Sequence, residues 1–289
     1  MSSDKNDPPL APGLYLVGTP IGNLEDITLR ALRILRSVDR IACEDTRQTQ
    51  KLLNHFGIQT PTVSYHLHNE GPRAEELLTQ LKAGARIAVV SDAGTPGIAD
   101  PGHEIANAAI AAGIPVFPIP GANAAISALI ASGIETESFT FHGFLPAKEG
   151  QRKTALEQLP RDSATHIFYK APHRILDTLA DLATIFGPSQ PVVIARELTK
   201  LHEEFLRGSA SDLHKQLASR AVVRGEIVLL FAPSAAEAST LQKSIATEVA
   251  ALMQSESLSE KDALKRVARD RGIGKSEAYR ELQRERGRS

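Results

Sequence analysis

Short apolar runs rich in β-branched residues alternate with amphipathic runs through the first 120 residues of the chain. Strands are predicted at 13–17, 40–43, 62–68, 86–90 and 115–119. Amphipathic helices are predicted between them at 26–38, with Asp26 as N-cap, and at 46–57, 71–84 and 103–113. A repeated strand–helix order implies a mainly parallel sheet with helices on both faces. The sequence therefore predicts an α/β fold.

The same kind of pattern restarts after residue 121. A helix of small residues at 121–133 is followed by strands at 138–145, 165–170, 191–197 and 225–231, with helices near 152–159 and at 172–187. The chain of 289 residues is long enough for two cores. We expect a flexible N-terminus at 1–12, an N-terminal α/β domain at 13–121, a C-terminal α/β domain at 122–235 and a helical tail at 236–289.

Charge is unevenly distributed along the chain. The formal net charge is −1, yet residues 260–289 hold ten Lys/Arg and six Asp/Glu. The tail is thus the basic part of a mildly acidic protein, which favours an anionic partner for the tail. Its helix, glycine turn and helix are typical of a helix-turn-helix. A helical hairpin packed on the body or on a second subunit fits the pattern equally well.

Cysteine content and hydropathy indicate in which cellular compartment the protein is expected. Cys43 is the single cysteine, which excludes an internal disulfide and a cysteine-based zinc cluster. The polar, proline-rich start lacks the apolar core of a signal peptide, and no run of 18 apolar residues occurs. We expect a cytoplasmic protein with no membrane span.

Each predicted strand of the first half ends in an elaborate loop. The loops are "GTPIGN", "EDTR", "HLHNEGPR", "SDAGTPGIADPG" and "PIPGANA". Ligands of open α/β sheets bind at this edge, and loops that only connect need about two to six residues. Neither a Walker lysine nor a G-x-G-x-x-G pattern is present, which argues against a nucleotide-binding hydrolase. Gly94 and Gly97 allow close backbone approach, so we expect a ligand held mainly through backbone and shape.

Eight ordered motifs carry a family resemblance over about residues 12–232. They are "YLVGTPIGNLEDIT", "IACEDTR", "SYHLHNE", "VSDAGTPGIADPG", "PIPGANA", "FHGFLP", "FYKAPHRI" and "ARELTK". Together they resemble the tetrapyrrole-methylase superfamily of S-adenosylmethionine-dependent (class III) methyltransferases, and most closely its members that act on ribosomal RNA. The resemblance implies two α/β domains with S-adenosylmethionine in the cleft between them, and a homodimer. It also implies 2′-O-methylation of a cytidine ribose in the decoding region of 16S ribosomal RNA in the small subunit.

Two other functions stay open at this point. One is a superfamily member that methylates a porphyrin precursor or a modified histidine, against which the "EDTR" and "HNE" motifs and the basic tail argue. The other is a non-catalytic RNA-binding assembly factor.

The resemblance also assigns residues to the cofactor. These are Pro20, Gly22, Asp92, Ala93, Gly94, Thr95, Ile98, Phe144, Leu145, Tyr169, Ala195, Arg196, Glu197, Leu198, Glu226, Ile227 and Val228. Small residues would let backbone groups reach the purine edge, and aromatic or apolar side chains would bury its face. Core packing is the alternative for each, above all for Ile98, Leu145 and Val228.

Methyl transfer depends largely on aligning the reacting groups. Because a ribose hydroxyl is a weak acid, a general base that takes its proton would also be useful. The catalytic candidates are His66, His68, Glu70, Asp45 and Lys170. Our hypothesis is that His68 and Glu70 lie at the reacting hydroxyl. His66 and His68 would face the same side of a strand, which also suits a metal pair. Without a third ligand in view, no metal is predicted.

Basic residues near the loops and in the tail are candidates for RNA phosphates. They are Arg30, Arg47, Arg73 and Arg174 by the loops, and Lys265, Arg266, Arg269, Arg271, Lys275 and Arg280 in the tail. Ion pairs with neighbouring acids such as Asp45 or Glu75 are the alternative for the first group.

Overall fold

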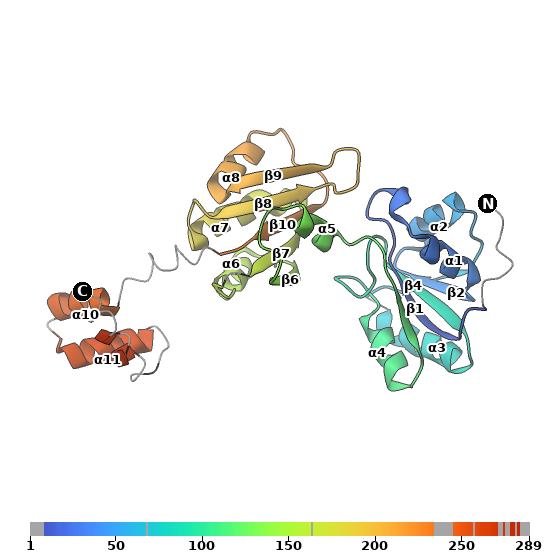
Figure 1. The fold of residues 1–289 in the computed structure, drawn as a ribbon, viewed down its shortest axis with the longest axis horizontal. Coiled ribbons are helices and arrows are strands. Elements are labelled where there is room, and N and C mark those ends of the chain that lie inside the picture. Colours follow the sequence, from blue (N-terminus) through green and yellow to red (C-terminus); the bar gives the residue numbers. More distant parts are fainter. Residues whose placement is uncertain are drawn as a thin grey trace. The chain divides into compact units, whose positions relative to one another are not determined.

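A computed structural model describes residues 9–67, 69–162, 164–233, 245–256, 258–270, 274, 278–280 and 282–283 (Figure 1). The chain divides into two compact units. The first comprises the residues up to Leu159 together with Ala164–Ala232, and it contains both sheets. The second consists of Pro160–Ser163 and Pro233–Ser289.

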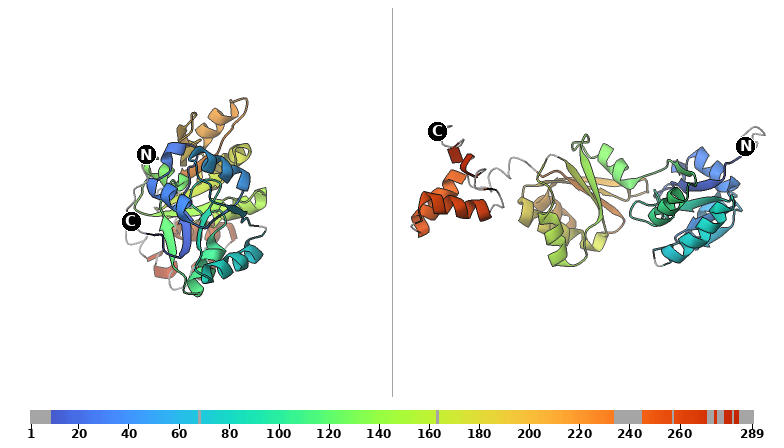
Figure 2. Two further views of the ribbon diagram at one scale, coloured as in Figure 1. Left: turned by 90° about the vertical axis from the view of Figure 1, so that its right-hand side faces the viewer. Right: turned by 90° about the horizontal axis from the view of Figure 1, so that it is seen from below.

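The first sheet contains only parallel strands, in the order β3-β2-β4-β1-β5. Its strands are β1 Gly13–Val17, β2 Arg40–Cys43, β3 Thr62–Ser64, β4 Arg86–Val90 and β5 Val116–Ile119. Its helices are η1 Leu24–Asp26, α1 Leu29–Ser37, α2 Thr46–His55, α3 Glu70–Lys82 and α4 His103–Ala111. Figures 1 and 2 show α1 and α2 on one face of this sheet and α3 and α4 on the other.

Alternation along the strands builds one core on each face of the first sheet. Tyr15 and Val17 of β1 pack with α1 and α2 in one cluster, while Leu14 packs with α3 and α4 in another. In β4, Ala88 belongs to the first cluster and Val89 to the second. Both faces are apolar because helices cover both, as parallel sheets require.

The second sheet is mixed, in the order β6-β7-β10-β8-β9. Its strands are β6 Phe139–Phe144, β7 Thr165–Lys170, β8 Pro191–Arg196, β9 Glu204–Ser209 and β10 Ile227–Phe231. Only β6 and β7 pair in parallel, and the other pairs are antiparallel. Its helices are α5 Ala124–Ile130, α6 Glu149–Glu157, η2 Pro172–Arg174, α7 Ile175–Phe186 and α8 Ala210–Ala218.

The strand β10 shows how the second core is divided. Its residues Ile227 and Leu229 pack with α6, α7 and α8, whereas Val228 and Leu230 pack with α5. The short helix α5 thus joins the second sheet, although it directly follows the first one in sequence. The predicted boundary between residues 121 and 122 stays a prediction, because both sheets belong to one compact unit.

Several predicted elements differ from the structure at their ends. The helix α1 begins after Thr28, whose hydroxyl accepts a hydrogen bond from Ala31 N, so the prediction of Asp26 as N-cap was wrong. The strand β3 ends at Ser64 because the Asn69 amide oxygen accepts the His66 N–H and closes a turn. The strand β9 and the helix α8 were not predicted at all.

The second unit has a small core of its own. It contains α10 Ile245–Glu256 and α11 Glu260–Asp270, which contact each other. Buried apolar residues join them to a short helical stretch, namely Ile245, Val249, Ala263, Val267, Ala268, Ala278 and Leu282. Most of the predicted "RGIG" turn, Arg271–Ile273, lies outside the described residues, as does Lys275.

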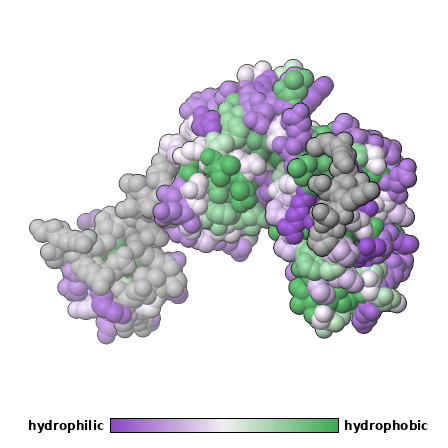
Figure 3. Space-filling model, turned by 45° about the vertical axis from the view of Figure 1, so that its right-hand side comes forward, coloured by the Kyte–Doolittle hydropathy of each residue, from purple (hydrophilic) through white to green (hydrophobic). Residues whose placement is uncertain are grey.

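Apolar side chains also remain exposed on both α/β halves. Figure 3 shows green surface gathered in patches between purple areas on each of them. The exposed set includes Leu29, Ile110, Ile126, Ile130, Phe144 and Leu201. Such patches are common at binding sites and interfaces. The homodimer implied by the resemblance stays a prediction.

Candidate functional site

The loops at the carboxyl edge of the first sheet are tied to one another by hydrogen bonds. The backbones of Thr19 and Gly94 exchange two of them, with N···O distances of 2.8 and 3.1 Å. The Asn123 amide donates to the Thr95 hydroxyl at 3.2 Å, and that hydroxyl donates to Ala122 O. The loops after β1, β4 and β5 therefore hold a common shape.

Close backbone packing explains two of the glycines. A Cβ added to Gly18 or to Gly121 would lie 2.8 Å from the backbone of the other residue. No other residue type fits such an approach, because real Cβ atoms do not come this close. Gly94 is needed for a different reason, since its φ of 80° lies in the left-handed region.

The "EDTR" loop after β2 joins the same assembly. Asp45 N donates to the Asp92 carboxylate at 3.0 Å. The Asp45 side chain caps α2 by accepting from Arg47 N, and its carboxylate also binds the Arg47 guanidinium. These bonds hold the pKa of Asp45 at about 2. Asp45 is thus a weak proton acceptor with a structural task.

A cavity of about 490 Å³ opens over these loops and is lined from both sheets. This volume falls in the range of small-molecule sites, about 300–1,000 Å³. Its lining includes predicted cofactor residues, namely Asp92, Ala93, Gly94, Thr95, Ile98, Phe144, Tyr169, Leu198, Glu226, Ile227 and Val228. It also includes Ala195, which was predicted as part of the same strand end as Leu198, and the catalytic candidate Lys170. The lining residues that were not predicted are Ile21, Glu44, Ala99, Asp100, Asn123, Ala124, Ala171 and Pro172.

The remaining predicted cofactor residues lie outside the lining. Pro20 is buried, and Leu145 packs in the core beneath α6 to α8. Arg196 binds the Glu204 carboxylate at 3.0 Å. These contacts give Leu145 and Arg196 structural tasks.

A strained loop accounts for Gly22 and Glu197, the other predicted residues outside the lining. The Glu197 carboxylate accepts Glu226 N and Lys200 Nζ, at 2.9 and 3.0 Å. Glu197 and Thr199 have positive φ of 52° and 65°. A Cβ on Gly22 would overlap the Lys200 side chain. The absence of a side chain at Gly22 therefore leaves room for the loop that contains Glu197 and Lys200. Strain of this kind needs a surrounding structure that fixes it.

The cavity is acidic on the side of the first sheet. Burial and the neighbouring Glu44 and Asp92 carboxylates raise the pKa of Asp100 to about 6. Burial, followed by the charge of Asp92, also raises the pKa of Glu44. Like charges held close together in a partly buried site favour a bound cation, which would stabilise all three carboxylates.

Lys170 stands at the end of β7, on the side of the second sheet. It is 3% exposed, and its Nζ has no hydrogen-bond partner among the described residues. Burial lowers its pKa to about 8, with Arg152 and Arg174 contributing through their positive charges. A substantial fraction of the amine is therefore neutral near pH 8.

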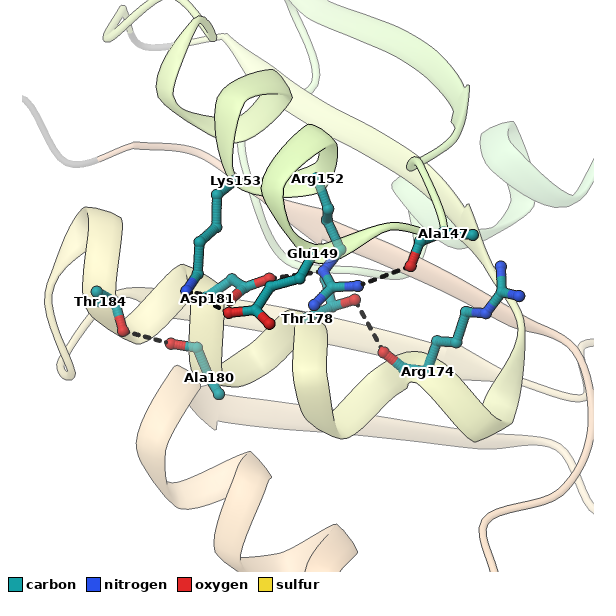
Figure 4. A network of polar contacts seen from close by, with 9 residues as sticks. All are labelled: Ala147, Glu149, Arg152, Lys153, Arg174, Thr178, Ala180, Asp181 and Thr184. Atoms are coloured by element: carbon teal, nitrogen blue, oxygen red, sulfur yellow. Dashed lines mark hydrogen bonds and ion pairs between the residues drawn. The ribbon is translucent and has the colours of Figure 1, made fainter.

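Figure 4 shows the polar network around Arg152, whose charge contributes to the lowered pKa of Lys170. Arg152 of α6 donates from Nε to the Asp181 carboxylate of α7 at 2.6 Å, and both side chains are almost fully buried. Lys153 bridges Glu149 and Asp181 from the same helix. The network joins α6 to α7 and keeps the Arg152 charge in the interior.

Two further catalytic candidates, Glu70 and His66, lie outside the cavity lining. Glu70 does not line the cavity: its carboxylate accepts Tyr65 Oη at 2.8 Å and Gly102 N at 3.0 Å in the interior. His66 follows the end of β3, so the prediction that it shares a strand face with His68 was wrong. His68 itself lies outside the described residues.

The candidates for RNA contacts fall into two groups. Arg30 is exposed on α1, and Arg174 is half-buried in η2. Arg47 is exposed but pairs with Asp45, and Arg73 pairs with Glu76. In the second unit, exposed basic side chains lie on α11, namely Lys265, Arg266 and Arg269.

Sequence reasoning passed over three polar cavity residues. Glu44 precedes the singled-out Asp45, Asp100 lies in the loop that was singled out, and Asn123 belongs to "PIPGANA". The motifs were therefore found, while the choice of residue within each motif needed the geometry.

Comparison with known proteins identifies the family. Residues 13–214 match the model of the tetrapyrrole (corrin/porphyrin) methylases. The chain belongs to this family. As a tetrapyrrole methylase it is an enzyme of the methyltransferase class, and the α/β fold with a helical C-terminal region is confirmed.

Relatives of this methylase are similar over nearly their whole length. The ribosomal RNA small subunit methyltransferase I of Halalkalibacterium halodurans is 49% identical over 275 residues, which cover 92% of this chain and 93% of that protein. The protein of the same name from Synechocystis sp. is 46% identical, covering 92% and 95%.

Solved structures share the methylase fold at low identity. Uroporphyrin-III-C-methyltransferase from Thermus thermophilus has a TM-score of 0.55 at 21% identity and covers 80% of this chain and 99% of its own. A diphthine synthase has a TM-score of 0.58 at 15% identity, covering 76% and 89%. These two similarities concern the fold alone.

The described ranges offer neither a membrane-spanning helix nor a cluster of metal ligands. Among them, no helix combines the length and apolar character that crossing a membrane takes. Nor does that part of the chain bring three His, Cys, Asp or Glu side chains together as metal ligands.

Proposed function

We propose that this methylase binds S-adenosylmethionine in the 490 Å³ cavity and methylates 16S ribosomal RNA of the small subunit. The proposed acceptor is the 2′-oxygen of a cytidine ribose in the decoding region. The observation that carries the proposal is the near full-length similarity to relatives named for this RNA, at 49% and 46% identity. The cytidine and its oxygen rest on the resemblance of the motifs.

The chemistry of the cavity fits the cofactor. Three carboxylates, on Glu44, Asp92 and Asp100, face a space that would hold a positively charged sulfur. Burial, and then the neighbouring carboxylates, raise the pKa values of Glu44 and Asp100, and a bound cation would offset both effects. Phe144 and Tyr169 offer aromatic rings with centroids 5.6 Å apart for a purine. When bound, S-adenosylmethionine supplies an activated methyl group.

The chain's own residues would orient the acceptor and take its proton. Of the candidates that the structure describes, only Lys170 lines the cavity. Because its pKa is lowered to about 8, its amine can accept a proton from an approaching ribose hydroxyl. Asp45 is less suited, since Arg47 holds its pKa at about 2.

Basic side chains would hold the RNA backbone. Arg30 and Arg174 belong to the unit that contains the cavity, and Lys265, Arg266 and Arg269 belong to α11 of the second unit. Contacts to phosphate position an RNA without reading its sequence. We propose that the tail contributes affinity and that the cavity determines the reacting nucleotide. A homodimer in the cytoplasm completes the proposal.

The test is ribose-methylation mapping of 16S ribosomal RNA. RNA from cells that lack the protein should miss one 2′-O-methylcytidine, and the wild-type gene should restore it. The Lys170→Met variant should restore little or none of it while the purified variant still binds S-adenosylmethionine. An unchanged ribose-methylation map in the deletion strain would contradict the proposal.

A further inference from the structure

The side chain of Glu70 connects two segments that are far apart in the sequence. Glu70 is the first residue of α3 and is 9% exposed. Its Oε1 atom accepts hydrogen bonds from Tyr65 Oη and from the backbone N–H of Gly102, at 2.8 and 3.0 Å. Tyr65 is 1% exposed, and Gly102 is buried. One carboxylate oxygen thus joins the segment after β3 to the end of the loop that follows β4.

The loop that receives this bond is closed upon itself. Gly97 N donates to Pro101 O at 3.0 Å. A Cβ on Gly102 would lie 3.0 Å from Gly97 N, and Gly102 has a φ of 137°. Ala99, between them, has a φ of 62°, which is unusual for a residue other than glycine. Such backbone persists only where the surroundings fix it.

The same loop forms much of the cavity wall. Its residues from Asp92 to Thr95 and from Ile98 to Asp100 line the cavity, whereas Glu70 and Tyr65 do not. The other end of the loop is held by the backbone pairing of Gly94 with Thr19. The Glu70 carboxylate therefore anchors the C-terminal end of the 92–102 loop without lining the cavity itself.

We propose that Glu70 is a positioning residue that fixes the 92–102 loop through Gly102 N–H and so preorganises the cofactor cavity. This inference rests on the proposed function only in naming S-adenosylmethionine as the occupant. A buried N–H that loses its acceptor costs the full desolvation penalty of that group, so the Gly102 N–H depends on the Glu70 oxygen. Without the carboxylate, the loop would sample other conformations, and binding would have to order it.

Two substitutions of Glu70 distinguish a positioning residue from a general base. Glu70→Gln keeps an oxygen that can accept both hydrogen bonds, so affinity and kcat should stay within about three-fold of the wild type. Glu70→Ala removes the acceptor, and the Kd for S-adenosylmethionine should rise roughly ten-fold to a hundred-fold, as expected for a buried donor left without an acceptor. A general base would lose kcat in both variants with little change in this Kd.

Hydrogen exchange provides a readout that needs neither cofactor nor RNA. In the full-length protein alone, the Gly102 amide and its loop neighbours should exchange about ten-fold faster or more in Glu70→Ala than in the wild type, and at nearly the wild-type rate in Glu70→Gln. Tyr65→Phe should have a smaller effect, because Gly102 keeps its acceptor. Glu75→Ala, at an exposed position of the same helix, is the matched control and should change nothing.

Two results would overturn the proposal. One is a fall in kcat of about a hundred-fold or more in Glu70→Gln at unchanged Kd, which would make Glu70 a general base. The other is unchanged exchange at Gly102 in Glu70→Ala. If that variant does not fold, Glu70→Gln still decides between the two roles. Faster loop exchange in a protein that never binds S-adenosylmethionine would uphold the anchor and refute the proposed cofactor.

Discussion

Replacing Asp100 by asparagine should stabilise the protein at neutral pH while weakening its hold on a cationic ligand. The folded pKa of Asp100 is about 6, against an ordinary value of 3.8, because burial and the carboxylates of Glu44 and Asp92 disfavour its charge. A carboxyl whose pKa is raised on folding destabilises the folded state above that pKa and costs nothing below the unfolded pKa. The introduced amide would keep an oxygen that can accept a hydrogen bond from Ser91.

The size of the effect follows from the two pKa values. The raised pKa of Asp100 lowers the free energy of unfolding by about 3 kcal/mol at pH 7.5, where the group is ionised in both states, at about 1.36 kcal/mol per pKa unit. At pH 4.5, where the folded state keeps a proton that the unfolded state has mostly lost, the cost falls to about 1 kcal/mol. Both figures are upper limits, because solvent that reaches the half-buried side chain screens its charge. Urea unfolding of Asp100→Asn at the two pH values should show gains up to these limits. At pH 7.5 the melting temperature should rise by about 2–4 °C for each kcal/mol gained.

Binding should change in the opposite direction. Over about pH 5.0–6.5, the affinity of the wild type for S-adenosylmethionine should rise by up to about eight-fold as Asp100 ionises, and the variant should show a shallower rise carried by Glu44. The reasoning is refuted if Asp100→Asn is no more stable than the wild type at pH 7.5. A gain in stability that is the same at both pH values would refute it as well.

Three further outcomes are expected. Gly225→Ala should lower the free energy of unfolding, measured by urea titration, by about 2 kcal/mol or more. The reason is that Gly225 has a φ of 91° and that a Cβ there would overlap the Glu197 carboxyl. A loss under about 0.5 kcal/mol would contradict this. Arg152→Met should lower the free energy of unfolding by about 3–5 kcal/mol in the same assay, because it leaves the Asp181 carboxylate buried with a 3.7 Å contact to Lys153. Adding Asp181→Asn to this variant should recover part of the loss. Deletion of residues 240–289 should weaken binding to the small ribosomal subunit and make that binding less dependent on salt, while the Kd for S-adenosylmethionine stays unchanged. Equal RNA affinity of the wild type and the deletion variant would show that the tail does not bind RNA.

Local patterns predicted most of the elements, and the reason lies in burial. Runs such as Arg86–Val90 are apolar on both faces because helices cover both, so they stand out in a single sequence. The strand β9, Glu204–Ser209, escaped notice because it is an edge strand with charged and small residues, and its pairing with β8 leaves no local signal. The shortened β3 depends on the side chain of Asn69, whose bond to His66 N competes with the strand.

Within the site, the sequence by itself determined which loops matter, because glycines and acids gather where strands end. Only the tertiary structure decided the task of each side chain. Asp45 and Glu70 fit the pattern of a base equally well, yet one is engaged by Arg47 and the other by Gly102, while Asp100 and Lys170 face the cavity. Hydrogen-bond partners and burial depend on contacts between residues far apart in the chain, and no local pattern encodes them.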